Sequence, residues 1–319
     1  MAVSPRLSRI ARRTALAIVA LFVASALTEH VLEVLDKARL TTDDTFCSVH
    51  NRRIRYRLTG AGQRGPTVVL ISGAGGTIEQ WHNVEDPLAV SSPVLTYDRG
   101  GLGFSDAADV HDPEGLAGEL GDLLQALKLA PSYVIVSYSS SSLMARLFVG
   151  HHEDQVKGVV LLDPILPKAQ LVGNRVLVSL RLKALVGLTR LKGYHRSHPV
   201  LTRREEKEQA VLASFHHWSA VAAEGTDLGD WTPSLMAAPA FAPIPVGVVC
   251  TFDEVVDGRS EPAVANTRLL AAESPHGTFL ALHHVKHSEL LTDPAALPLA
   301  IDVIRSVEDQ AREPAAHGP

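Results

Sequence analysis

Apolar residues fall into two patterns along the chain. Some recur every three or four positions, whereas others form short unbroken runs rich in β-branched residues, at 67–71, 94–97, 133–136, 156–162, 246–250 and 278–282. An unbroken run of this kind is typical of a strand buried on both faces of a parallel sheet. Because segments with helical spacing separate several of these runs, as between Leu116 and Leu127, the pattern predicts an α/β fold.

Two further segments flank this predicted core. Residues 46–50 and 53–58 alternate around Asn51-Arg52, which predicts a β-hairpin ahead of the first buried strand. Near the other end, the pattern predicts a helix over 289–304. The residues beyond Val307 are polar with prolines, and we expect them to fray.

The first residues carry a targeting signal. Four arginines, at positions 6, 9, 12 and 13, precede an uncharged apolar run over 14–27. This arrangement is typical of a signal peptide, and Ala24-Ser25-Ala26 offers a cleavage site. Apolar residues resume over 31–35, so an uncleaved anchor that leads into an amphipathic helix is the alternative. The arginines should stay in the cytoplasm, and we expect the main domain to be extracytoplasmic, either secreted or anchored to the cell membrane.

Residues 167–243 do not continue the alternation of strands and helices. Their apolar residues come at helical spacing with basic residues between them, which predicts a group of helices. The basic first half fits a solvated helix face, and the alternatives are anionic or amphipathic substrates or contact with a membrane surface. The histidines here have no carboxylate or cysteine at ligand spacing, so we expect surface histidines and no metal site; they are His195, His198, His216 and His217.

Composition narrows the class of protein. With 319 residues, of which 46% are apolar, the chain can bury one large α/β core. The net charge of −5 and the lack of a dense basic patch give no reason to expect a nucleic-acid partner. The two cysteines, Cys47 and Cys250, fall on strands that we expect to lie apart, so both should be free thiols.

The segment 133–148 carries the first candidate for catalysis. A buried strand passes into a helix through small residues, Ser137-Tyr138-Ser139-Ser140-Ser141, in the frame of the G-x-S-x-G nucleophile elbow. Such a turn strains its central residue and leaves room only for small neighbours, so Ser139 is the candidate nucleophile. Serines replace both glycines, and an ordinary polar helix start is the alternative.

A glycine-rich loop, Ser72-Gly73-Ala74-Gly75-Gly76, follows the strand at 67–71. Its spacing matches neither nucleotide-binding fingerprint, and no lysine follows as in a P-loop. Glycines also let backbone N–H groups approach a developing negative oxygen, as an oxyanion hole requires. We therefore expect the N–H groups of Ala74 and Ser140 to form such a hole.

The segment after the strand at 94–97 makes the pattern specific. It reads Asp98-Arg99-Gly100-Gly101-Leu102-Gly103-Phe104-Ser105-Asp106 and stands between the glycine-rich loop and the serine elbow. A strand that ends in D-R-x-G-x-G-x-S in this place resembles the α/β-hydrolase superfamily, in its esterase and lipase-like branch, over about residues 46–307. The resemblance implies an eight-stranded, mostly parallel sheet with helices on both faces. It also implies a helical cap inserted over 167–243 and a largely structural role for the D-R-x-G loop.

The same resemblance implies a base and an acid in the chain order Ser–acid–His. The base should follow the last strand and precede a helix, which favours His287 over His283 and His284. The acid should follow the strand at 246–250.

That position makes Asp253 the first choice for the acid, with Glu254 as its nearest competitor. Asp163, at the end of the strand at 156–162, is the reserve candidate, because some members of the superfamily carry the acid there.

The predicted organisation has five segments. They are an N-terminal signal or anchor with its linker (1–40), a hydrolase core in two parts (41–166 and 244–310), a helical cap (167–243) and a flexible tail (311–319). The expected reaction is hydrolysis of carboxylic esters or related acyl substrates through Ser139, His287 and Asp253, without a cofactor or metal. The same triad also serves thioesterase, peptidase, perhydrolase and C–C hydrolase chemistry. A weakly active binding protein on this fold is a further alternative. The expected partners are a small acyl substrate and, through the N-terminal segment, a membrane.

Overall fold

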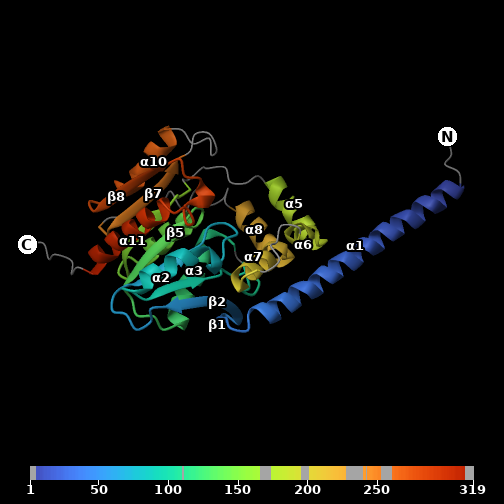
Figure 1. Cartoon of the computed structure of the whole chain (residues 1–319), viewed down its shortest axis with the longest axis horizontal. Helices are drawn as coiled ribbons and strands as arrows, with labels where there is room; N and C mark the ends of the chain where they lie inside the picture. Colours follow the sequence, from blue (N-terminus) through green and yellow to red (C-terminus); the bar gives the residue numbers. More distant parts are fainter. Residues whose placement is uncertain are drawn as a thin grey trace, which may run out of the picture.

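The computed structural model describes residues 5–109, 111–165, 174–194, 201–227, 240–241, 243–252 and 261–312. Its centre is an eight-stranded sheet in the order β1-β2-β4-β3-β5-β6-β7-β8 (Figure 1). The strands are β1 (Thr45–Val49), β2 (Arg52–Thr59), β3 (Thr67–Ile71), β4 (Val94–Tyr97), β5 (Tyr133–Tyr138), β6 (Val156–Leu162), β7 (Val246–Phe252) and β8 (Gly277–His283). The β1–β2 and β2–β4 pairs are antiparallel, and all other neighbours are parallel. The fold class expected from the sequence is confirmed.

Helices cover both faces of the sheet, because successive strand residues point to opposite sides. On one face, Val69 and Leu95 pack in a core with α3 (Pro113–Ala126), α4 (Ser141–His151) and the end of α10 (Glu261–Ala271). On the other, Val68 and Leu70 pack with α2 (His82–Ala89) and α11 (Ala296–Arg312). Because strands β3 to β8 are parallel, their carboxyl ends lie at one edge of the sheet, where the loops after β3, β5, β6 and β8 meet.

The described residues between β6 and β7 include four helices that lie to one side of the sheet (Figure 1). They are α5 (Asn174–Leu185), α6 (Leu188–Tyr194), α7 (Arg203–Ala213) and α8 (Phe215–Asp227). We call this group the cap. Ala220 of α8 lies against Gly101, in the loop after β4. The cap therefore packs on the loops at the carboxyl edge.

The N-terminal segment forms one continuous helix, α1 (Pro5–Leu40), which projects from the body of the protein beyond the cap (Figure 1). The apolar run and the amphipathic segment expected from the sequence both belong to it. Residues at helical spacing face the cap and are buried or half-buried; they are Ser25, Glu29, Glu33, Asp36 and Leu40. Within the described ranges, α1 is the one helix long and apolar enough to cross a membrane.

The C-terminal helix differs from the expected one. A short 3-10 helix (His287–Glu289) comes first, and α11 begins only at Ala296. The carboxylate of Asp293 accepts the N–H groups of Ala295 and Ala296, both at 2.9 Å, and so caps a helix that starts after Pro294. The helix then continues to Arg312, because its apolar face packs on the sheet, and fraying does not begin at Val307.

Candidate active site

The turn between β5 and α4 has the geometry of a nucleophile elbow. Ser139 lies in the left-handed region with φ 60°, a strained conformation for a residue with a side chain. Its backbone N–H donates to the carbonyl of Leu162 (2.9 Å). A Cβ at Gly73 would lie 2.9 Å from the Cβ of Ser139. The glycine-rich loop therefore approaches the serine so closely that position 73 has no room for a side chain.

The serines in place of the two elbow glycines are compatible with the turn. Ser137 is fully buried. The hydroxyl of Ser141 accepts the N–H of Tyr138 (3.0 Å) and lies 2.8 Å from the carbonyl oxygen of Ile71, to which it donates. The second bond ties the start of α4 to the end of β3. A hydroxyl at position 141 thus stabilises the sharp bend.

His287 lies beside the elbow, in the short helix after β8. Its imidazole stacks on the ring of Tyr138, with the centroids 4.9 Å apart and 13° between the planes. The Tyr138 hydroxyl donates to the backbone carbonyl of His287. These contacts hold the imidazole against Tyr138, the residue that directly precedes Ser139. The described hydrogen bonds do not include one between Ser139 Oγ and His287, a bond that often tightens only when substrate binds.

Asp163 binds the Nδ1 atom of His287. Its carboxylate also accepts the backbone N–H of Thr251 (3.0 Å) and the Thr251 hydroxyl (2.6 Å). Asp163 is fully buried at the end of β6 and has φ 47°. A carboxylate in this position accepts the Nδ1–H of the imidazole, and Nε2 is then left free to take up a proton.

The acid ranked first from the sequence, Asp253, lies outside the described residues, as does its competitor Glu254. β6 and β7 are neighbours in the sheet, so a residue after either strand is close to the same edge. Of the three candidates, Asp163 is the one for which the structure describes a contact with His287.

The two oxyanion donors expected from the sequence lie on segments that meet at the elbow. Ala74 is exposed in the glycine-rich loop, and Ser140 is the N-cap residue of α4. In the described part of the chain, neither backbone N–H has a hydrogen-bond partner. Unpaired donors beside a candidate nucleophile are what an oxyanion hole requires, and the assignment of these two residues remains a prediction.

Arg99 fixes the glycine-rich loop. Its guanidinium donates to the carbonyls of Ser72 and, at 3.1 Å, Gly73. It also forms a two-point ion pair with Glu224 of α8, at 3.0 and 2.8 Å. Both side chains are buried, and although burial alone would lower the pKa of Arg99, Glu224 raises it above its usual value. A buried bidentate pair therefore links the cap to the loop.

Asp98 connects the loops around the site. Its carboxylate accepts the N–H groups of Ile78 (2.8 Å) and Phe104 (3.1 Å) and pairs with Arg55 (3.3 Å). Arg55 is fully buried and also pairs with Glu79 (2.6 Å). Buried charges are tolerated when they are paired in this way. The D-R-x-G segment is thus bound by side chains to β2 and to the loop after β3.

His217 of α8, expected at the surface, is fully buried. It precedes Ala220 and Val221 by one helical turn and so shares the buried face of α8. Its Nδ1 accepts the N–H of Gly103 (3.2 Å), which puts the proton on Nε2. Burial lowers the pKa of His217 to about 3, so the ring is neutral at pH 7. Among the described residues Nε2 has no hydrogen-bond partner, and it faces Gly75 of the glycine-rich loop.

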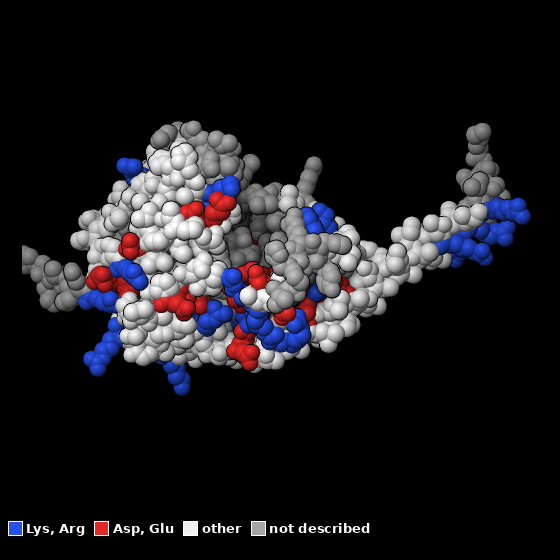
Figure 2. Space-filling view, viewed as in Figure 1, with Lys and Arg blue, Asp and Glu red and all other residues white. Residues whose placement is uncertain are grey.

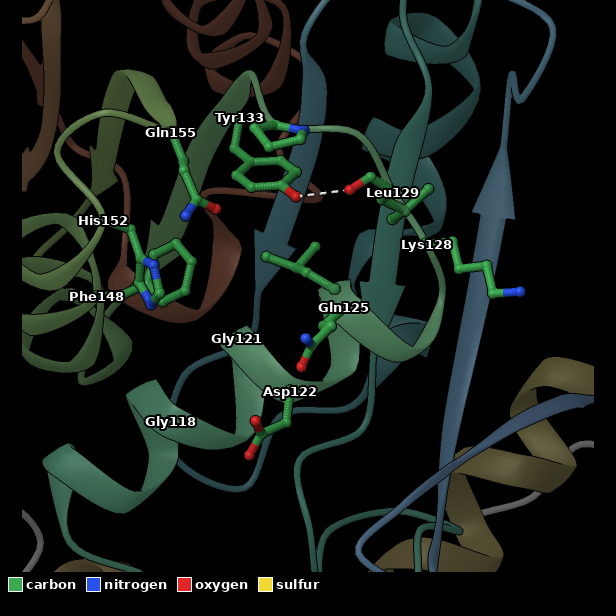
Figure 3. Close-up of a pocket in the computed structure, with 12 residues that line it drawn as sticks. Gly118, Gly121, Asp122, Gln125, Lys128, Leu129, Tyr133, Phe148, His152 and Gln155 are labelled. Atoms are coloured by element: carbon green, nitrogen blue, oxygen red, sulfur yellow. Dashed lines mark hydrogen bonds between the residues drawn. The ribbon is translucent and has the colours of Figure 1, made fainter.

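A cavity of about 610 Å³ lies elsewhere, against α3 (Figure 3). Its lining includes Asp122, His152 and Tyr133, whose hydroxyl donates to the carbonyl of Leu129 (2.8 Å). Tyr133 is the first residue of β5, whereas the elbow follows the last residue of that strand. The cavity is therefore at the opposite edge of the sheet and separate from the candidate active site.

Comparison with known proteins agrees with this architecture. Residues 66–180 match the family model described as the α/β hydrolase fold. The matched segment runs from β3 through the elbow to α5, and the whole sheet agrees with solved hydrolase structures. The chain has the α/β-hydrolase fold. The α/β-hydrolase fold expected from the sequence is confirmed, and the match over residues 66–180 agrees with the expected superfamily.

Similar proteins match this chain over different spans. An uncharacterized hydrolase of Bacillus subtilis, YraK, is 30% identical over 54% of this chain. The chain spans 42% and 61% of the lengths of the two curated relatives that it matches. The enol-lactonase of Burkholderia xenovorans has a TM-score of 0.61 and 20% identity over 84% of this chain and all of its own. A membrane phospholipase A has a TM-score of 0.60 and 18% identity over 97% of this chain and 99% of its own.

Proposed function

We propose that this α/β-hydrolase is a serine hydrolase of carboxylic esters, with Ser139 as nucleophile, His287 as base and Asp163 as the acid that orients the base. The observation that carries the proposal is the contact of His287 with both Asp163 and Tyr138, the residue before Ser139. An imidazole that is held by a buried carboxylate and stacks on the residue before a serine in a strained elbow supports this assignment. Such a group is the arrangement by which a serine hydroxyl is activated.

The reaction proceeds in two halves. Nε2 of His287 takes the proton of Ser139 Oγ as the oxygen attacks the substrate carbonyl, and the imidazolium formed is stabilised by Asp163. The N–H groups of Ala74 and Ser140 stabilise the oxyanion. His287 then gives its proton to the leaving alcohol, which leaves an acyl group on Ser139. In the second half, water loses a proton to His287 and attacks the acyl carbonyl, and the proton returns to Ser139 as the acid departs.

Asp163 replaces Asp253 in this proposal because its contact with the imidazole is described. Both residues satisfy the chain order Ser–acid–His, so the order itself does not choose between them. The Thr251 hydroxyl and N–H fix the Asp163 carboxylate, and the burial of this group strengthens its interaction with a nearby imidazolium.

Esters are the favoured substrate class. Two similar structures are named as an enol-lactonase and a membrane phospholipase A, and lactones and phospholipids both contain ester bonds. The 97% of this chain covered by the phospholipase leaves out about ten residues, so the likeness includes most of α1. We propose that α1 anchors the protein in the cell membrane with the arginine-rich end in the cytoplasm and the catalytic domain outside.

The experiment that tests the chemistry is labelling of the folded full-length chain with a fluorophosphonate, followed by mass mapping of the adduct. We expect one adduct on Ser139, its loss in Ser139→Ala, and its retention in Ser140→Ala, which keeps the backbone N–H of residue 140. Absence of labelling in a folded wild-type protein would instead favour a binding protein on this fold. A panel of nitrophenyl esters, acyl thioesters and aminoacyl amides then separates esterase from thioesterase and peptidase activity, and we expect the esters to be hydrolysed fastest.

A further inference from the structure

The first half of the cap carries an apolar and basic surface that the proposed chemistry does not use. We propose that α5 and α6 rest in the headgroup region of an anionic phospholipid membrane, beside the point where α1 leaves the bilayer. This inference rests on the membrane anchor of the proposed function and is independent of the catalytic residues.

The length of the apolar part of α1 determines how deep in the bilayer the residues in contact with the cap lie. A spanning helix needs about 20 apolar residues, or ~30 Å. The shallowest placement starts the span at Ile10 and lets Arg12 and Arg13 reach toward the headgroups. A span of about 20 residues from there ends at Glu29. Ser25 then lies ~6 Å inside the apolar layer, because each helical residue rises ~1.5 Å.

The cap touches α1 at this same level. The Ser25 hydroxyl donates to the carbonyl of Val186, at the junction of α5 and α6 (2.9 Å). Arg190 of α6 pairs with Glu29 (2.6 Å) and with Asp36 (2.6 Å). Glu29 is only 3% exposed, so its charge is paired and shielded from lipid by the cap. The junction of α5 and α6 therefore reaches the depth of the last turns of the span.

The face of α1 that points away from the cap stays apolar beyond Glu29. Its exposed side chains are Leu27, Val31, Val34 and Leu35, with 62%, 55%, 54% and 57% of their surface accessible. Leu27, Val31 and the neighbours Val34 and Leu35 follow one another at helical spacing and form one stripe. If this stripe is also buried in lipid, the span extends beyond Glu29. The cap then lies deeper in the bilayer than in the placement that starts at Ile10.

The surfaces of α5 and α6 suit a lipid interface. Both helices expose large apolar residues, including Leu182 (53%), Leu188 (51%) and Leu191 (60%). Neither helix contains an acidic residue, and Lys183 and Lys192 are exposed. Figure 2 shows the uncharged shaft of α1 in white between its arginine-rich end and the cap. Apolar side chains with interspersed lysines are typical of helices that lie in the headgroup layer of anionic membranes.

The test uses the full chain in phosphatidylglycerol-containing nanodiscs with spin-labelled lipids as quenchers. A fluorophore is attached to single cysteines at Leu191, at Phe22 in α1 as the positive control, and at Leu269 as the control of equal exposure on α10 (63%). Cys47 is replaced by serine, and Cys250 is too buried to react. We expect strong quenching at positions 22 and 191 and none at 269.

The outcomes separate this proposal from the anchor. Quenching at 22 with none at 191 would overturn the proposal while the anchor stands. Lack of quenching at both positions would overturn both, and neither result bears on the esterase chemistry. As a second measurement, Lys183→Glu with Lys192→Glu should reduce quenching at 191 in anionic nanodiscs, whereas Arg64→Glu on the exposed loop before β3 should leave it unchanged. Equal quenching in both variants would refute the role of anionic lipid.

Discussion

Replacement of Asp163 by asparagine tests the acid of the proposed triad. Among the described residues, the carboxylate accepts hydrogen bonds from His287 and from the N–H and hydroxyl of Thr251. Asparagine has the same shape but one acceptor oxygen. If that oxygen stays on the Thr251 N–H, the amide NH₂ group faces His287 and donates where an acceptor is needed.

The consequence is the wrong tautomer of the base. Nδ1 of His287 must then accept, so Nε2 carries the proton and cannot take another from Ser139. Loss of this function in a serine triad lowers kcat by about 10⁴-fold, which corresponds to ~5.5 kcal/mol of transition-state stabilisation. The free energy of unfolding should fall by less, about 1–3 kcal/mol, because buried groups lose a matched partner.

The assay is steady-state hydrolysis of a nitrophenyl ester, with urea unfolding of each variant to show that it is folded. The matched control is Asp253→Asn, which should keep kcat within about threefold, because in the proposed triad Asp163 supplies the carboxylate that orients the base. The assignment is refuted if Asp163→Asn keeps its kcat, or if Asp253→Asn is the variant that loses it.

Three further predictions concern the support of the site. Gly73→Ala places a Cβ 2.9 Å from the Cβ of Ser139, and we expect the rate of ester hydrolysis to fall at least about 100-fold. Gly62→Ala, which has open space around it, should leave the rate unchanged in the same assay. Glu224→Gln leaves the buried Arg99 without its counter-charge, and urea titration should show a loss of about 3–5 kcal/mol; an unchanged midpoint would contradict the role of this pair. His217 is neutral in the fold down to about pH 3, whereas the unfolded chain binds a proton below about pH 6.5, so stability is lost as the pH falls through this window. Between pH 6.5 and 4.5 the wild-type free energy of unfolding should fall by about 2–3 kcal/mol more than that of His217→Gln, as measured by urea unfolding. An equal fall in the two proteins would contradict this prediction.

The sheet could be predicted from the sequence because its signals are local. The buried strands are largely apolar runs, and the bounds of β3, β4 and β6 match the expected runs at 67–71, 94–97 and 156–162. The elbow has a comparable local signal. Where a strand turns into a helix through a few small residues, only the central residue, here Ser139, fits the place of the nucleophile. The place of His287 after the last strand follows from the same order of elements.

The acid could not be chosen in the same way. Asp163 and Asp253 each follow a strand, and those strands are adjacent in the sheet, so sequence order is satisfied by either. The choice depends on which carboxylate finds donors, and Thr251 provides them to Asp163 through the pairing of β6 with β7. A contact between residues so far apart in sequence has no local signal.

The contacts of the cap were missed for a related reason. Glu224 lies far along the chain from Arg99, and nothing in the helical spacing of the cap marks it as the partner of the D-R motif. His217 did carry a signal, because it lies one turn before the apolar pair Ala220 and Val221. The stripe of α1 that faces the cap was also visible in the spacing of Glu29, Glu33 and Asp36.

The ion pair between Arg99 and Glu224 restricts how far α8 can move from the glycine-rich loop. If α8 swung outward, the arginine would be stranded without its counter-ion, at a cost of about 3–5 kcal/mol, and the carbonyls of Ser72 and Gly73 would lose the clamp that keeps their loop in shape. We therefore expect α8 to keep its position over this loop during turnover. Any motion of the cap should involve the other cap helices, so changes in α5 and α6 should affect turnover more than conservative changes on the exposed side of α8.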